Sequence, residues 1–217
     1  MIQPGGGCAS QYKALGEKGV EALRQFVLGG GKYYGVCAGA FLATQPYKAT
    51  NKSEFRMGLV PFRDDEPSHY RGVAPIKVTL TDEGKAVFDG SATNRTVVYA
   101  GGPVVVPGKP IEDTDIKVLA KYAGRIINTN QPFPIEEMAG KAAFLGGRVG
   151  KGKVFLSCPH PEKDEATFDL VRNGIKYLTG VAPSPVYLNR TRGAVAVRYR
   201  SSDKASVEFL FSKGPPV

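Results

Sequence analysis

The sequence predicts an α/β fold with a doubly wound, mainly parallel sheet. Near its start the chain has an apolar strand end, a glycine loop (residues 4–7), an amphipathic helix over residues 14–28 and a second strand that ends at Val36. The apolar side chains of the helix recur every three or four positions, and three glycines follow it. Two strands joined by a helix in this way lie parallel in one sheet. Ligands bind such sheets at the carboxyl ends of the strands.

A sharp turn joins the second strand to a second helix within residues 31–44, GKYYGVCAGAFLAT. The pattern glycine-x-nucleophile-x-glycine between a strand and a helix is that of a nucleophile elbow, with Cys37 at its centre. Glycines stand where side chains would clash, and a helix N-terminus favours a thiolate over a thiol. The alternative is that Cys37 is a buried structural cysteine, since buried free cysteines are common.

A second group of reactive side chains follows a predicted hairpin, whose strands are residues 142–149 and 153–157. In the motif SCPHPE that comes next, His160 stands two residues before Glu162. Such neighbours point the same way in extended backbone, so Glu162 could orient the imidazole toward a nucleophile. The only other histidine, His69, lies in a polar stretch and is the weaker candidate for a base. The alternative is a surface turn that carries both side chains by chance.

Alternating apolar residues predict the remaining strands, and helical spacing predicts two more helices. The strands are expected at residues 75–80, 96–99, 104–106 and 115–122, and the helices begin near residues 81 and 164. Residues 45–74 are polar and are predicted to form a surface excursion. Its acidic run, residues 64–66, is expected to face solvent rather than bind a metal ion.

The chain changes character after Gly180. A stiff connector, Pro183-Ser184-Pro185, leads to predicted strands at residues 186–188, 194–199 and 206–211. We therefore expect an α/β domain at residues 1–180 and a C-terminal β hairpin or meander at residues 181–217 that packs on it. A role of this extension in docking a partner is the alternative.

Composition excludes several classes of function. The net charge is +9, but the basic residues are spread along the chain, so no nucleic-acid partner is predicted. No apolar run reaches membrane-spanning length, and no membrane association is expected. Cys8, Cys37 and Cys158 have no metal-binding spacing and form no disulfide framework, which favours a reducing, cytoplasmic compartment. No metal ion or cofactor is expected.

Taken in order, the PGGG loop, the GVCAGA elbow and the late strand before HPE resemble class I glutamine amidotransferases. The stretches YYGVCAGAFLAT, LTDEGKAVFDG, VVYAGGP and GRVGKGKVFLSCPHPE are similar to the amidotransferase-like N-terminal domain of biotin–protein ligases, which also occurs as a stand-alone protein. The similarity covers about residues 2–180. It implies a flavodoxin-like amidotransferase fold, with a first strand and helix expected ahead of Met1. No biotinyl-adenylate loop is present, so ligation is not predicted.

The resemblance also implies roles for particular residues. Cys37 matches the nucleophile, His160 the base and Glu162 the acid that orients the base. The implied oxyanion hole consists of backbone amides at Gly6, Gly7 and Ala38. The implied substrate-binding residues are Gly5, Tyr99, Gly101 and Gly102. Residues that would clamp glutamine are not recognised, and Ala38 stands where the intracellular-protease-like relatives place a histidine.

Three functions follow as alternatives. The first is a cysteine-dependent amidase or amidotransferase-like hydrolase that acts on a small-molecule carboxamide through a thioester. The second is a non-catalytic binding or regulatory module that retains the geometry of the triad. The third is a structural domain that docks a protein partner, or a second copy of itself, through its C-terminal strands.

Overall fold

The computed structural model describes residues 1–46, 55–65, 72–88, 92–124 and 138–181, together with the backbone of two strands at residues 194–200 and 206–212. His69 and the predicted strand at residues 186–188 lie outside the described residues. Within these ranges, no helix is both long and apolar enough to cross a membrane.

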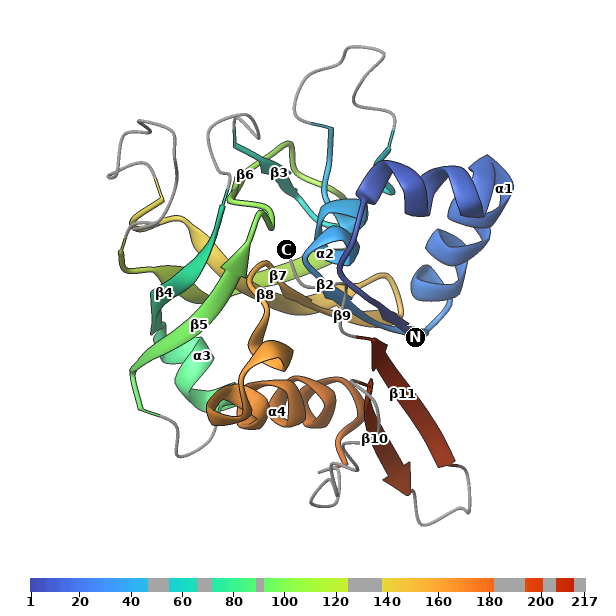
Figure 1. The fold of residues 1–217 in the computed structure, drawn as a ribbon. Coiled ribbons are helices and arrows are strands. Elements are labelled where there is room, and N and C mark those ends of the chain that lie inside the picture. The colour runs from blue at the N-terminus through green and yellow to red at the C-terminus, as the bar shows by residue number, and fades with distance from the viewer. Residues whose placement is uncertain are drawn as a thin grey trace.

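A mixed sheet forms the centre of the fold (Figure 1). Its strands follow one another in the order β1-β2-β9-β8-β7-β4-β5, and β6 pairs with both β3 and β8. The bounds are β1 Ile2–Gln3, β2 Lys32–Val36, β3 Phe62–Asp64, β4 Val73–Leu80, β5 Asn94–Ala100, β6 Val105–Pro107, β7 Thr114–Tyr122, β8 Ala142–Val149 and β9 Gly152–Ser157.

The α/β class is confirmed, but the prediction of a mainly parallel, doubly wound sheet is wrong. Among the described strands, β1 with β2 and β2 with β9 are parallel pairs, and the other pairs of this sheet are antiparallel. Helix α1 (Cys8–Leu28) crosses from β1 to β2, as a parallel pair requires. In contrast, a tight turn with Gly150 at positive φ joins β8 to β9, and such hairpins join antiparallel strands.

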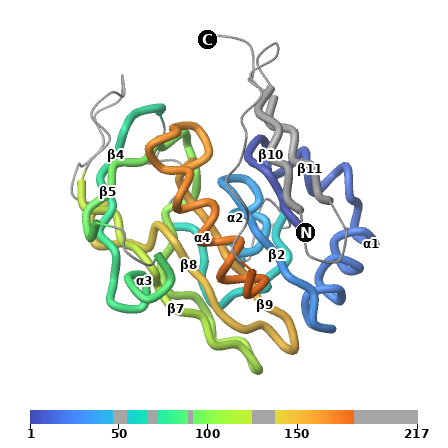
Figure 2. Tube along the Cα trace, turned by 90° about the horizontal axis from the view of Figure 1, so that it is seen from below, coloured from blue at the N-terminus to red at the C-terminus, as the bar shows by residue number. Residues whose placement is uncertain are grey.

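Three helices, α1 (Cys8–Leu28), α2 (Ala38–Ala43) and α4 (Phe168–Thr179), cover the two faces of the parallel part of the sheet. Tyr33 points toward α2, where its hydroxyl donates to the carbonyl of Gly39 at 2.8 Å. Tyr34 points to the opposite face, against Gly174 of α4. Figure 2 views the α4 side, with α3 beside α4. The helices are α1 Cys8–Leu28, α2 Ala38–Ala43, α3 Asp82–Val87 and α4 Phe168–Thr179, and 3-10 turns precede α4 at Pro161–Lys163 and Glu165–Thr167.

Most predicted elements are present, with shifted ends. Helix α1 starts earlier than predicted, directly after the glycine loop, and is kinked where Gly16 has a φ of 65°. Thr81 caps α3, because its side chain accepts the amide of Gly84 at 3.0 Å. Helix α4 ends at Thr179, and Gly180, which follows it, has the left-handed conformation typical of a helix stop.

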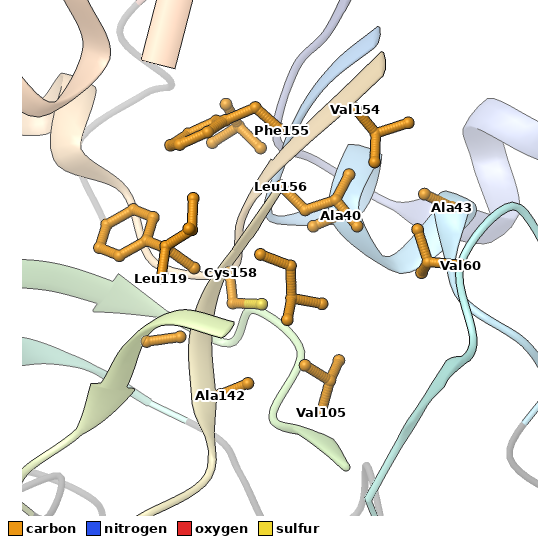
Figure 3. Packing of buried hydrophobic residues seen from close by; sticks show 14 of the residues in the cluster. Ala40, Ala43, Val60, Val105, Leu119, Ala142, Val154, Phe155, Leu156 and Cys158 are labelled. Carbon is orange, nitrogen blue, oxygen red and sulfur yellow. The ribbon is translucent and has the colours of Figure 1, made fainter. Parts of the chain in front are cut away.

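The hydrophobic core lies on both faces of β9. Its side chains alternate: Phe155 points away from α2, whereas Leu156 points toward Ala40 in α2 (Figure 3). On the Phe155 side, the ring of Phe155 packs against two other aromatic rings. Its centroid lies 4.8 Å from that of Tyr34 and 6.1 Å from that of Phe144, which are ordinary distances for aromatic pairs. This core fixes β2 and β9, the two strands that lead into the predicted site.

The first residue of the acidic run at residues 64–66 does not face solvent as predicted, and Glu66 lies outside the described residues. Asp64 is completely buried, so the expectation that this run faces solvent is wrong for its first member. The reason is that β3 pairs with β6, which turns the Asp64 carboxylate inward toward the amide of Val104, 3.3 Å away. The neighbouring Asp65 forms an ion pair with Lys141.

The C-terminal hairpin is present as backbone. Strands β10 (Ala194–Arg200) and β11 (Ser206–Ser212) form a separate antiparallel pair. The predicted strands at residues 194–199 and 206–211 are therefore confirmed. Packing of this extension on the rest of the domain stays a prediction.

Candidate active site

Cys37 occupies a sharp turn between β2 and α2. It has a φ of 48° and a ψ of −104°, an unusual conformation for a residue with a side chain. Its amide donates to the carbonyl of Ser157 at 2.8 Å, and its carbonyl accepts the amide of Phe41 at 2.8 Å. These bonds hold the strained residue between two rigid elements, which is the geometry of a nucleophile elbow.

Two glycines make this elbow possible. A β-carbon at Gly35 would lie 2.7 Å from the carbonyl oxygen of Gly39, and one at Gly39 would lie 2.2 Å from that of Gln3. Both distances are far shorter than a non-bonded contact allows, so larger residues would push β1, β2 and α2 apart. The glycine pattern in the sequence therefore reflects the close packing of these three elements.

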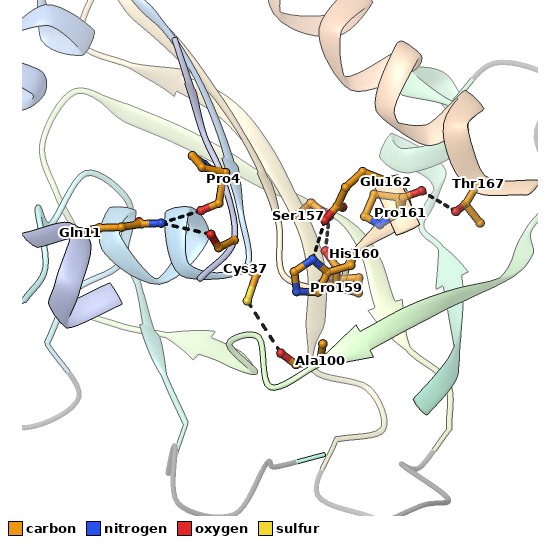
Figure 4. A network of polar contacts seen from close by, with 11 residues as sticks. Pro4, Gln11, Cys37, Ala100, Ser157, Pro159, His160, Pro161, Glu162 and Thr167 are labelled. Atoms are coloured by element: carbon orange, nitrogen blue, oxygen red, sulfur yellow. Dashed lines mark hydrogen bonds and ion pairs between the residues drawn. The ribbon is translucent and has the colours of Figure 1, made fainter. Parts of the chain in front are cut away.

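The structure brings His160 and Glu162 together with Cys37. His160 Nδ1 lies 2.5 Å from Oε1 of Glu162 (Figure 4). The side chain of Cys37 lies close enough to the imidazole to contribute to the raised pKa of His160. Because Nδ1 faces Glu162, Nε2 is the nitrogen left for the thiol. The contact between His160 and Glu162 agrees with their spacing in the sequence, and the catalytic roles of the three side chains stay a prediction.

Short polar contacts fix the turn that carries His160. The His160 amide donates to the carbonyl of Val98 at 2.7 Å, which ties the turn to β5. The Ser157 hydroxyl donates to the carbonyl of Pro159 at 2.8 Å, and that of Thr167 donates to the carbonyl of Pro161 at 2.7 Å. Sequence reasoning missed Thr167, because a threonine near a helix start gives no sign of reaching back to a proline six residues earlier.

The electrostatics favour a protonated imidazole. Burial would lower the pKa of His160, but hydrogen bonds to Cys37 and Glu162, with the negative charges of both groups, outweigh it and raise the pKa from 6.5 to about 9. At neutral pH the site therefore holds an imidazolium next to Sγ of Cys37. Burial raises the pKa of the other two thiols, Cys8 and, much more strongly, Cys158.

The glycine loop lies against this pair of side chains. A β-carbon built on Gly5 would be 2.7 Å from Cε1 of His160 and 3.5 Å from Cβ of Cys37. Gly6 has a φ of 133°, which L side chains rarely adopt, and Gly7 is the N-cap of α1. Ala38 is the first residue of α2. The predicted oxyanion-hole residues therefore come from the starts of two helices beside Cys37, and their role stays a prediction.

A second loop, residues 100–103, borders Sγ of Cys37. The carbonyl oxygen of Ala100 lies 4.0 Å from Sγ, a contact that sequence reasoning missed. Gly101 has a positive φ of 67°, and a β-carbon on Gly102 would lie only 1.9 Å from the carbonyl oxygen of Cys158. Tyr99 is completely buried, and its hydroxyl donates to the carbonyl of Gly102 at 2.7 Å. This places Tyr99 beneath the loop, where it supports the predicted substrate-binding glycines.

Cys8 lies on the other side of the glycine loop, with an arginine that sequence reasoning also missed. Its Sγ is 3.2 Å from Nη1 of Arg56 and 3.2 Å from the carbonyl oxygen of Phe55. The charge of Cys37 contributes to the raised pKa values of both Cys8 and Cys158, so the three free cysteines share one region. Within the described ranges, no group of three or more His, Cys, Asp or Glu side chains is arranged to hold a metal ion.

A cysteine elbow with a histidine and a glutamate on a sheet of this kind is typical of glutamine amidotransferase-like proteins. Two solved structures share the fold. One, described as a glutamine amidotransferase, has a TM-score of 0.54 at 20% identity and covers 83% of this chain and 78% of its own. The other, PurLQS from Thermotoga maritima, has a TM-score of 0.50 at 18% identity over 82% and 79% of the two chains.

Sequence comparison identifies one relative and a family. The pyridoxal 5'-phosphate synthase subunit PdxT of Geobacillus sp. (strain WCH70) is 27% identical over 132 residues, which are 60% of this chain and 62% of that relative. The family described as biotin-protein ligase, N terminal, matches residues 1–61 and 68–181. The chain belongs to this family, within the class I glutamine amidotransferase-like proteins.

Proposed function

We propose that the protein is a cysteine-dependent amide hydrolase that acts on a small-molecule carboxamide in the manner of a glutaminase. The observation that carries the proposal is the hydrogen-bonded pair of His160 and Glu162 beside Cys37, which occupies an elbow. The family relationship supports the same chemistry, because similar proteins are described as glutamine amidotransferases.

The reaction requires Cys37 as a thiolate, paired with the imidazolium of His160. The sulfur attacks the carbonyl carbon of the carboxamide, and the electron pair of the C=O bond moves to the oxygen. Backbone amides at Gly6 and Ala38 stabilise this oxyanion, and each such donor contributes about 3 kcal/mol to lowering the barrier. His160 then gives a proton to the nitrogen, the C–N bond breaks, and ammonia or an amine leaves.

The second half of the reaction releases the acid. His160, now neutral, takes a proton from a water molecule that attacks the thioester carbon. The C–S bond breaks, a carboxylic acid leaves, and the proton on His160 restores the starting pair. Glu162 accepts a hydrogen bond from Nδ1 of His160 and keeps the imidazole in the tautomer and orientation that both halves need.

Ammonia release tests this proposal directly. The full chain is incubated with a panel of carboxamides that begins with L-glutamine, and a Cys37→Ala variant serves as the blank. We expect release from at least one carboxamide, its loss in Cys37→Ala, and its retention in Cys158→Ala, whose thiol is buried and fully protonated. Ammonia release that survives in Cys37→Ala would overturn the assignment of the nucleophile.

One observation favours a binding or regulatory module as the second candidate. Cys37 is only 5% exposed, and a substrate must reach its sulfur past Gly5 and Ala100. Alkylation by iodoacetamide at about pH 6 separates the two functions, because a reactive thiolate is alkylated well below the ordinary pKa of a cysteine. A Cys37 that resists alkylation there, in a protein that releases no ammonia, would favour the module.

A further inference from the structure

Gln11, in the first turns of α1, holds the glycine loop in three places. Its side-chain Nε2 donates to the carbonyl of Pro4 at 2.8 Å and, at the long limit of a hydrogen bond, to that of Gly5 at 3.5 Å. Its backbone amide donates to the carbonyl of Gly7 at 3.0 Å. Figure 4 shows Gln11 on one side of Pro4 and Cys37 on the other. Nothing in the sequence pattern had singled out this glutamine.

These bonds fix the direction of the amides in the loop. In a trans peptide the C=O and N–H groups point in opposite directions, and the described chain contains no cis peptide. Carbonyls of Pro4 and Gly5 that face Gln11 therefore turn the amides of Gly5 and Gly6 away from it. That opposite side holds Cys37 and His160, which a β-carbon on Gly5 would touch. Among the described residues, no backbone carbonyl accepts either amide.

Gln11 keeps this position although one of its side-chain polar atoms lacks a hydrogen bond. Its Oε1 is buried and has no hydrogen-bond partner among the described residues. A buried polar atom without a partner destabilises a fold, and its presence calls for an explanation. Orientation of the loop by Nε2 provides one.

We propose that Gln11 is a positioning residue for an oxyanion site, which it builds by aiming the amides of Gly5 and Gly6 at the substrate oxygen beside Cys37. This inference rests on the proposed hydrolase function. It extends the predicted site, because Gly5 then serves as a hydrogen-bond donor to the oxyanion. The partial positive charge at the N-terminus of α1, which begins at Cys8, favours negative charge at the same point.

Two reagents distinguish this role from a structural one. p-Nitrophenyl acetate acylates Cys37: the sulfur attacks the acetyl carbon, the oxygen becomes negative, the C–O bond breaks, and nitrophenolate leaves with the electron pair. Iodoacetamide alkylates Cys37 by displacing iodide, and no oxyanion forms. The ratio of the two rates therefore reports the oxyanion site separately from the reactivity of the thiolate.

The variant Gln11→Met retains the length of the side chain but has no donor. Gln25→Met is the matched control, because Gln25 is an exposed glutamine of the same helix whose Nε2 bonds only Glu21, at 2.7 Å, among the described residues. Gln11→Glu, which places an acceptor against the two carbonyls, provides a second variant of unchanged size. Mass spectrometry of the acetylated peptide, with Cys37→Ala as the blank, verifies the site of acylation.

We expect Gln11→Met and Gln11→Glu to slow acylation of Cys37 about tenfold or more, since one oxyanion donor typically contributes a factor of that size or larger. Alkylation by iodoacetamide and its pH profile should stay within about twofold of the unmodified protein, and Gln25→Met should change neither rate. Equal losses of both rates, or no loss of acylation, would overturn the role of Gln11 while leaving the hydrolase proposal intact. Absence of any acylation of Cys37 in the unmodified protein would overturn both.

Discussion

Gly5 and His160 are in such close contact that any side chain on Gly5 would displace the imidazole. The position of a β-carbon on Gly5 is 2.7 Å from Cε1 of His160. The ring cannot easily withdraw, because its backbone is bonded to Val98 and its Nδ1 to Glu162. Gly5 and His160 are 155 positions apart in the sequence. The contact between them therefore fixes the position of the glycine loop relative to the HPE turn.

This contact predicts the effect of Gly5→Ala. The added methyl group should push the imidazole away from Cys37 or Glu162 and slow alkylation of Cys37 at about pH 7 tenfold or more, because the thiolate loses its paired cation. The rate is measured with iodoacetamide, and thermal unfolding is recorded alongside it. Gly19→Ala in α1 is the control, since a β-carbon there meets Leu15 at 3.3 Å, far from the site. An unchanged rate in Gly5→Ala would contradict the contact.

The assignment of the base predicts a difference between the two histidines. His160→Ala should abolish alkylation of Cys37 at neutral pH, because it removes the base and the positive charge beside the sulfur. His69→Ala should barely change the rate. Alkylation rates of the two variants between about pH 5 and pH 9 test this directly. The reverse pattern would remove His160 from the proposed triad.

Local constraints made the sharp turn at Cys37 and the contact between His160 and Glu162 predictable, whereas a catalytic role of these side chains stays a prediction. The glycines at 35 and 39 are required within a few residues of Cys37, and the spacing of His160 and Glu162 is set by extended backbone. Gln11, Arg56 and the Ala100 carbonyl could not be predicted in the same way. These groups matter because of their contacts with segments that are distant in the sequence. Neither the residue types nor their local pattern predicts such contacts.

The pairing of strands was the other feature of the fold that the sequence did not predict. Alternation of apolar residues predicts that a strand exists, but not which neighbour it pairs with or in which direction. Asp64 illustrates the consequence. In the sequence it is the first of three acidic residues, a pattern typical of a solvated turn. Pairing of β3 with β6, some 40 residues later, turns its side chain into the core.

The raised pKa of His160 predicts a loss of stability at high pH. Between pH 6.5 and about 9 the folded protein binds a proton that the unfolded chain has lost. The contribution is complete below pH 6.5 and disappears as the pH rises through about 9. The difference in pKa corresponds to roughly 3 kcal/mol of unfolding free energy. Urea unfolding across this range should show the decline, and His160→Gln should lack it; parallel curves for the two proteins would contradict the shift.

Asp64 predicts a second loss of stability in a lower pH range. Burial is the main cause that raises its pKa from 3.8 to about 7, against the opposing effects of Arg56 and the Val104 amide. One of its oxygens, Oδ2, is buried without a hydrogen-bond partner among the described residues. Because the folded state favours the neutral acid, stability should fall as the pH rises from 3.8 through about 7.

Asp64→Asn therefore should stabilise the protein above neutrality, since an amide of the same shape carries no charge into the core. We expect a gain in unfolding free energy of a few kcal/mol, at most about 4 kcal/mol, near pH 8 and little change near pH 4. Asp115→Asn, at an exposed ion pair with Lys117, is the control and should change stability by less than about 1 kcal/mol. Urea unfolding at the two pH values gives the comparison. Equal destabilisation of Asp64→Asn at the two pH values would contradict this prediction. It would show that the carboxyl group is needed for packing and that its charge does not cause the pH dependence.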